Sequence, residues 1–63
     1  MKYTKLFEEL DKRKLSAWQL VKEEVIGKNT LRSLRNDQPV SMYSLEQISR
    51  FLELDITSLF DTD

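Results

Sequence analysis

Apolar residues recur at intervals of three and four along almost the whole 63-residue chain, and this spacing constrains the fold more than any other feature. Such spacing puts apolar side chains on one face of an α-helix. No segment alternates convincingly with the period of two that is typical of a half-buried strand. The pattern therefore predicts an all-α fold.

The N-terminal half contains two expected helices. Tyr3, Phe7 and Leu10 follow one another at i, i+4 and i+7, with Leu6 beside them, which predicts a first amphipathic helix. Ser16 is a good N-cap for the second, because its hydroxyl can accept a hydrogen bond from a free N–H of the first turn. The inward-facing residues expected in that second helix are Leu20 and Val21.

The segment "VIGK" holds the only glycine and predicts a turn, after which "NTLRSLRN" predicts a short third helix. Leu31 and Leu34 are expected to face its interior side. The only proline ends this helix, and Ser41 is the expected N-cap of a fourth, with Ser44 as a competing start. The buried stripe expected in the fourth helix consists of Met42, Leu45, Ile48 and Leu52.

The C-terminal segment "ITSLF" predicts one last helical turn. Asp55 is expected to cap it, and Leu59 and Phe60 are expected to return to the core. Five short helices with connections of two to four residues predict a single compact domain over residues 1–63.

The composition excludes several kinds of chemistry. The chain has no cysteine and no histidine, which removes disulfides, thiolate nucleophiles, the commonest general base and the commonest neutral metal ligand. No acidic residues are spaced as an acid–base pair, so we expect no enzyme activity, no metal and no cofactor. No apolar run approaches the roughly 20 residues of a membrane helix, and the N-terminus lacks a signal-peptide pattern. A soluble, cytoplasmic protein is expected.

Charge is unevenly distributed, although the formal net charge is only −1. Residues 28–45 carry three basic residues and one acid, whereas residues 46–63 carry one basic residue and five acids. At helical spacing Lys28, Arg32 and Arg35 lie on one side of the third helix. Such a cluster is either a solvated helix face or a contact surface for an anionic partner.

The segment "LSAWQLVKEEVIGKNTLRSLRNDQPVSMYSLEQISRFLELDITSLF" resembles the Cro/C1-type helix-turn-helix family, in particular the short stand-alone bacterial and phage regulators. The resemblance covers nearly the whole chain and rests on an ordered set of pieces. These are Leu15-Ser16, Leu20, Ile26, Thr30-Leu31, Leu34, Leu45, Ile48, Leu52, Leu54 and "DITSLF". It implies a compact five-helix, lambda-repressor-like DNA-binding domain with its helix-turn-helix at about residues 16–36.

The resemblance also implies a function. In this family the third helix lies in the major groove of double-stranded DNA, and a homodimer reads two half-sites. A sequence-specific transcriptional regulator, acting as a repressor, is therefore expected. The residues that match DNA-contacting positions are Ser16, Lys28, Asn29, Thr30, Arg32, Ser33, Arg35 and Asn36.

The sequence departs from the family in the turn and in the second helix. Val25 stands where the family usually has glycine, and a β-branched residue tolerates a positive φ poorly. The turn is therefore expected to be rebuilt around Gly27, with Asn29 as the N-cap of the third helix. Ala17 replaces a glutamine that often contacts a phosphate in the family.

A second function stays open, namely a protein-interaction module on the same fold, such as an antitoxin or a phage-encoded inhibitor. It would act through Trp18, Phe51 or the acidic C-terminal surface. Trp18 is expected either to pack against the first or last helix or to anchor a partner. Tyr43 and Phe51 belong either to the core or to a dimer surface. Three further apolar residues are candidates for that surface, namely Leu54, Ile56 and Phe60.

Overall fold

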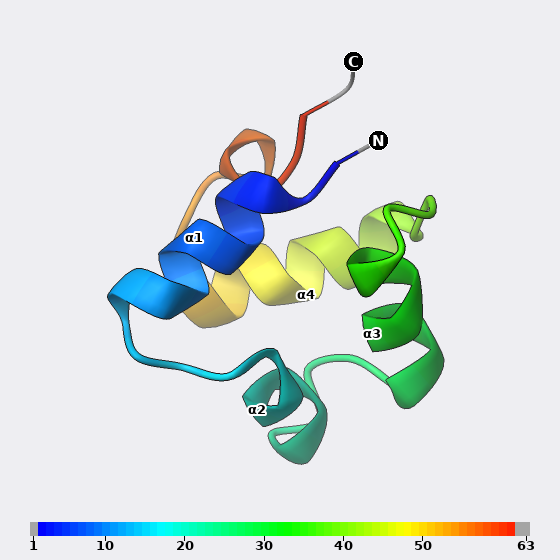
Figure 1. The fold of residues 1–63 in the computed structure, drawn as a ribbon, viewed down its shortest axis with the longest axis horizontal. Coiled ribbons are helices and arrows are strands. Elements are labelled where there is room, and N and C mark those ends of the chain that lie inside the picture. The colour runs from blue at the N-terminus through cyan, green and yellow to red at the C-terminus, as the bar shows by residue number, and fades with distance from the viewer. Residues whose placement is uncertain (1, 62–63) are drawn as a thin grey trace.

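The computed structural model describes residues 2–61, and this part of the chain consists of four α-helices and one 3-10 helix (Figure 1). The elements are α1 (Thr4–Lys12), α2 (Ala17–Lys22), α3 (Lys28–Arg35), α4 (Met42–Leu52) and the 3-10 helix η1 (Ile56–Ser58). The all-α prediction is confirmed. The last helical turn predicted near the C-terminus is a 3-10 helix of three residues, so the described chain has four α-helices and not five. Within the described residues no helix is long and apolar enough to cross a lipid bilayer.

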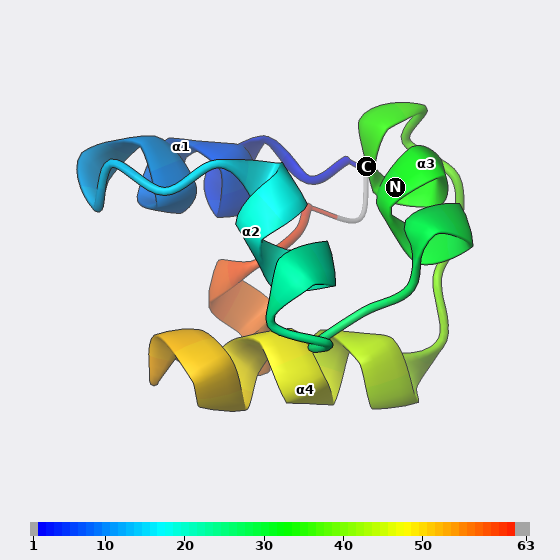
Figure 2. The same ribbon diagram turned by 90° about the horizontal axis from the view of Figure 1, so that it is seen from below.

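The helices enclose the core from several sides. In Figure 2, α1 and α4 run along opposite sides of the molecule, with η1 between them. Helix α3 lies at the end of the molecule in both views, and α2 packs against it (Figures 1 and 2). The two ends of the chain meet in an isolated antiparallel bridge between Lys2 and Asp61. The position of α3 at the end of the molecule leaves much of its surface exposed.

One cluster of apolar side chains forms the core, with contributions from every α-helix and from the residue after η1. Its buried members are Tyr3, Leu6, Leu10, Leu20, Ile26, Leu31, Leu34, Leu45, Ile48, Leu52 and Leu59. Phe7, Val21 and Phe60 are half-buried at its border. Met42 contradicts the sequence prediction, because its side chain is 57% exposed. It lies in the first turn of α4, before the buried stripe begins at Leu45.

The starts of two helices are as predicted, and the start of α3 is not. The Ser16 hydroxyl accepts a hydrogen bond from the Trp18 N–H (3.0 Å), and the Ser41 hydroxyl accepts one from the Ser44 N–H (3.2 Å). Helix α3 begins at Lys28 with Gly27 as its N-cap, so the prediction of Asn29 as N-cap is wrong. Gly27 already has the extended backbone that an N-cap needs, with φ −89° and ψ 170°. Asn29 consequently lies inside the first turn.

The connection between α2 and α3 is not built around Gly27 either. Its left-handed residue is Glu24, with φ 60°, whereas Gly27 has a negative φ. The Glu24 N–H donates to the Val21 carbonyl (3.0 Å) and the Val25 N–H donates to the Leu20 carbonyl (2.9 Å), which is the Schellman ending of a helix. Val25 follows the left-handed position, so no glycine is required there.

Candidate nucleic-acid interface

The exposed side of α3 carries cations that have no ionic partner within residues 2–61. Lys28, Arg32 and Arg35 are exposed, while Leu31 and Leu34 are buried against the core. The ion pairs found in this part of the chain use other cations, namely Lys5, Lys12 and Arg13. The predicted separation of a basic side and an apolar side of α3 is therefore confirmed.

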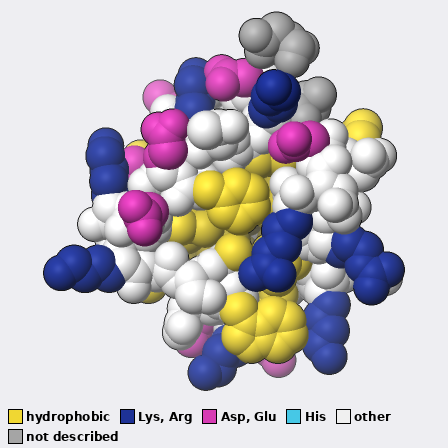
Figure 3. All heavy atoms as spheres, in the orientation of Figure 1, with side chains coloured by type: hydrophobic (Ala, Val, Ile, Leu, Met, Phe, Trp, Pro, Cys, Tyr) yellow, Lys and Arg dark blue, Asp and Glu magenta, His cyan; other side chains and the backbone are white. Residues whose placement is uncertain are grey.

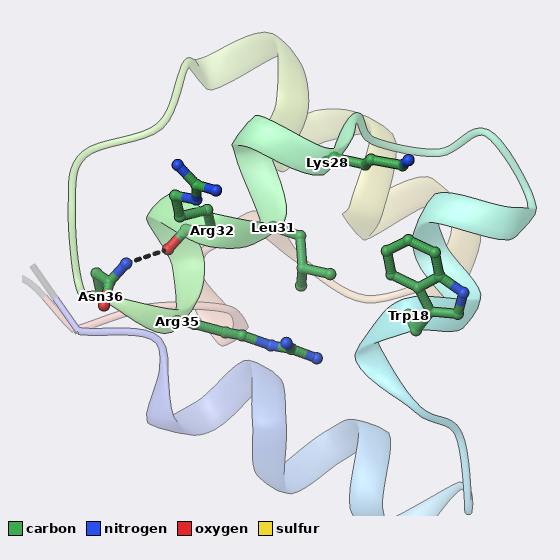
Figure 4. Close-up of a pocket in the computed structure, with 6 residues that line it drawn as sticks. All are labelled: Trp18, Lys28, Leu31, Arg32, Arg35 and Asn36. Carbon is green, nitrogen blue, oxygen red and sulfur yellow. Dashed lines mark hydrogen bonds between the residues drawn. The ribbon is translucent and has the colours of Figure 1, made fainter.

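A depression of about 330 Å³ lies between α2 and this basic side of α3. Its six lining residues are Trp18, Lys28, Leu31, Arg32, Arg35 and Asn36 (Figure 4). The Lys28 ammonium lies 5.9 Å from the centre of the Trp18 ring, within the range of a cation–π contact. Figure 4 shows the Arg35 side chain extending toward Trp18, while the guanidinium of Arg32 is turned away from it.

The space-filling view agrees with this arrangement. Figure 3 shows apolar surface bordered by lysine and arginine side chains over α2 and α3. Most of the aspartate and glutamate side chains on the same face lie nearer to α1 and the chain ends. The near-neutral total charge therefore conceals a local basic surface, as the sequence predicted.

Other predicted contact residues lie on a different side of α3. Asn29, Thr30 and Ser33 line a second depression, of about 260 Å³, which faces the segment 39–44. Asn29 is exposed, whereas Thr30 and Ser33 are half-buried. The structure thus divides the predicted set into a cationic group beside Trp18 and a neutral polar group beside the start of α4.

Two of the predicted residues also have structural hydrogen bonds. The Ser16 hydroxyl caps α2, as described above, and keeps its own proton and a second lone pair for a partner. The side-chain amide of Asn36 donates to the Arg32 carbonyl at the end of α3, with a distance of 3.0 Å. Both side chains are exposed, but their hydrogen-bonding capacity is partly used within the protein.

Trp18 also belongs to this surface, although the sequence did not place it among the DNA-contacting residues. Its side chain is 44% exposed and lies beside α3, rather than against the first or last helix. Its placement depends on the angle between α2 and α3, which the connection 23–27 determines. The sequence contains no local signal for that angle.

The aromatic residues of α4 lie outside this surface. Tyr43 is 70% exposed and Phe51 is 39% exposed, so neither belongs to the buried core. Leu54, Ile56 and Phe60 are half-buried and pack against the core cluster. Among the predicted interface residues, Tyr43 therefore has the largest exposed fraction, followed by Trp18 and Phe51.

Tyr3 holds the segment that follows α3. Its buried hydroxyl donates a 2.7 Å hydrogen bond to the Gln38 carbonyl. Burial raises the pKa of this hydroxyl; a hydrogen bond with the Val40 backbone opposes the shift, and the charge of Asp37 adds to it. The N-terminal end of the chain thereby fixes the path of residues 37–40 between α3 and α4.

Comparison with known proteins adds no identification: no protein-family model, no curated protein and no solved structure matches this chain. The resemblance to the Cro/C1-type family stays a prediction from the residues quoted above.

Proposed function

We propose that the protein is a sequence-specific DNA-binding transcriptional regulator that acts as a repressor. In this proposal α2, the connection 23–27 and α3 form a Cro/C1-type helix-turn-helix. The observation that carries the proposal is the basic surface of α3, where Lys28, Arg32 and Arg35 are exposed with no acidic partner within residues 2–61. Cations in such a surface attract the phosphates of DNA.

The dimensions of α3 suit a major groove. An α-helix with its side chains is about 10–12 Å in diameter, which fits the major groove of B-DNA with its width of about 12 Å, and the eight residues of α3 span about 12 Å along the helix axis. Because α3 lies at the end of the molecule (Figures 1 and 2), it can enter the groove without a neighbouring helix in front of it. The exposed start of α3 would approach the base edges first.

The side chains of α3 divide into two roles in this proposal. Lys28 and Arg32 have donors that suit the O6 and N7 atoms of guanine, and Asn29 has an amide that suits adenine. Arg35 and Asn36, at the end of the helix, contact the phosphate backbone and so set the position of the protein on the duplex.

A homodimer completes the proposal. A single module buries only about 600–1,000 Å² on DNA, so tight selection of one site favours two copies. The exposed aromatic side chains of α4, Tyr43 and Phe51, are the surface that we propose for the contact between copies. Such a dimer would read half-sites about one helical turn apart.

The same two aromatic side chains favour a second candidate function, that of a protein-interaction module. Exposed aromatic residues are enriched where proteins bind one another. On this reading Tyr43 and Phe51 contact a different protein, and the domain has little affinity for DNA. Salt dependence separates the two candidates, because release of counterions makes DNA binding fall steeply with salt.

The test begins with selection of duplexes from a random pool, followed by anisotropy titration of the enriched duplex at several salt concentrations. We expect the logarithm of the association constant to fall linearly with the logarithm of the salt concentration. Arg32→Ala should weaken binding by about 1–3 kcal/mol and relax the preference at one base position. Arg50→Ala is the matched control, because Arg50 is an exposed arginine on α4.

Two results would contradict the proposal. One is the absence of any duplex that binds above the non-specific level at low salt. The other is an equal loss of affinity in Arg32→Ala and Arg50→Ala, which would mean that the charge of the whole molecule, and not α3, determines binding.

A further inference from the structure

The depression between α2 and α3 combines two kinds of surface. The indole of Trp18 and the side chain of Leu31 are apolar, and the side chains around them include three cations and no acid. Lys28 and Arg35 approach the indole from different positions along α3 (Figure 4). A ligand that matches this depression must carry both negative charge and apolar surface.

Most simple ligands match only one of these two kinds of surface. An inorganic anion would leave the indole without a contact, and an apolar side chain would desolvate the cations with no compensating charge. A nucleotide unit has a phosphate and, within a few ångströms, the apolar carbons of its sugar. Lys28 and Arg32 also belong to the surface proposed above to enter the groove, so a DNA strand in that groove passes beside the depression.

We infer that this depression holds one sugar–phosphate unit of the bound DNA strand. Trp18 packs against the deoxyribose, and Arg35 pairs with the adjoining phosphate. Trp18 is thereby a DNA-contacting residue that positions the strand at the edge of the groove. The inference rests on the proposed function and adds to it a contact from α2.

The site is organised before any ligand arrives. The backbone of Trp18 is held at the start of α2 by the hydrogen bond from its N–H to the Ser16 hydroxyl. The centre of its ring lies 5.9 Å from the Lys28 ammonium, a cation–π contact that favours this orientation of the indole. The contact reduces the conformational entropy that the indole loses when DNA binds, which makes DNA binding more favourable.

The chain contains a single tryptophan, so its intrinsic fluorescence reports on this site alone. The experiment titrates the selected duplex into the full-length protein and records Trp18 emission and the anisotropy of the labelled DNA in parallel. We expect both signals to change with the same midpoint. Sodium polyglutamate, at the same concentration of negative charge, stands in for an acidic protein surface and should leave the emission unchanged.

Substitutions test how much each contact contributes to the affinity for DNA. Trp18→Ala should weaken binding about tenfold, which is at the lower end of the range for aromatic side chains that stack on bases. Trp18→Phe should recover most of the loss, because phenylalanine keeps an aromatic surface for the sugar. Arg35→Gln should reduce the slope of the salt dependence by about one. Met42→Ala is the control, since Met42 is an exposed apolar side chain that does not line the depression.

The outcomes separate this inference from the proposed function. If the anisotropy shows binding while Trp18 emission is constant, and Trp18→Ala binds within about twofold of Met42→Ala, the inference is wrong and the proposed function stands. An equal emission change with polyglutamate would assign the depression to acidic proteins and also overturn the inference. If no duplex binds, the proposed function fails and the inference fails with it.

Discussion

At the scale of single residues, Tyr3 connects the N-terminal end of the chain to the segment after α3. Its raised pKa means that the folded protein favours the neutral hydroxyl. Above the ordinary value of 10.0 the unfolded chain loses this proton while the folded chain retains it. The resulting stabilisation is therefore complete below that pH and is lost as the pH rises through the folded-state pKa.

The substitution Tyr3→Phe should remove this part of the pH dependence of the free energy of unfolding. At neutral pH we expect a loss of about 1 kcal/mol in the free energy of unfolding, because the hydrogen bond to the Gln38 carbonyl is lost. Near pH 10.5 the difference between wild type and variant should be smaller, since the wild type has by then begun to lose the contribution. Urea unfolding of both proteins at the two pH values measures this difference in the free energy of unfolding. A difference that does not change with pH would contradict the contribution of the Tyr3 hydroxyl to the pH dependence.

At the scale of elements, all four α-helices of the described chain end in the same way. The left-handed residue at each end is a charged residue and not a glycine: Lys14, Glu24, Asp37 and Glu53. A left-handed backbone costs such residues about 1 kcal/mol relative to glycine. The hydrogen bonds of the Schellman endings and the core contacts of the helices offset this cost.

Glu24→Gly should therefore stabilise the protein by about 0.5–1 kcal/mol, because glycine adopts the left-handed conformation without strain. Glu23→Gly is the matched control one residue earlier, where φ is −84°. It should destabilise the protein by a similar amount, about 0.5–1 kcal/mol, since it adds freedom only to the unfolded chain. Thermal unfolding measures the shift in melting temperature of each variant. Two shifts of the same sign would refute the position of the left-handed residue at Glu24.

At the scale of the whole molecule, the C-terminal segment closes the core. The buried side chain of Leu59 follows η1 and joins the cluster formed by the α-helices. Asp61 then pairs through its backbone with Lys2 and through its carboxylate with Lys5 (3.2 Å). The ion pair is exposed and contributes little, so burial of Leu59 is the main contribution of this segment to stability.

Leu59→Ala should cost about 2–5 kcal/mol of unfolding free energy, because it removes methyl groups from the core and leaves a cavity. A chain of this size has only about 5 kcal/mol in total, so the variant should retain about 0–3 kcal/mol and unfold at a much lower temperature than the wild type. Phe51→Ala removes a larger but partly exposed side chain and should cost much less. Circular dichroism distinguishes them, and an equally well-folded Leu59→Ala would contradict the described core.

The candidate site was predictable in part. The cations of α3 and their separation from Leu31 and Leu34 follow from helical periodicity, a local property of the sequence. The division of the predicted residues between two sides of α3, and the place of Trp18 beside Lys28, do not follow from it. They depend on how α2 and α4 pack against α3.

The sequence by itself determined the helical class, most residues of the core and two of the helix starts. Each of these depends on interactions between residues a few positions apart, such as the repeat of leucines or the hydroxyl of Ser16 reaching the N–H of Trp18. The tertiary structure decided where the left-handed turn falls, how far Met42 is exposed and which side of α3 Trp18 faces. These depend on the relative orientation of whole helices, which is set by packing between residues far apart in the chain.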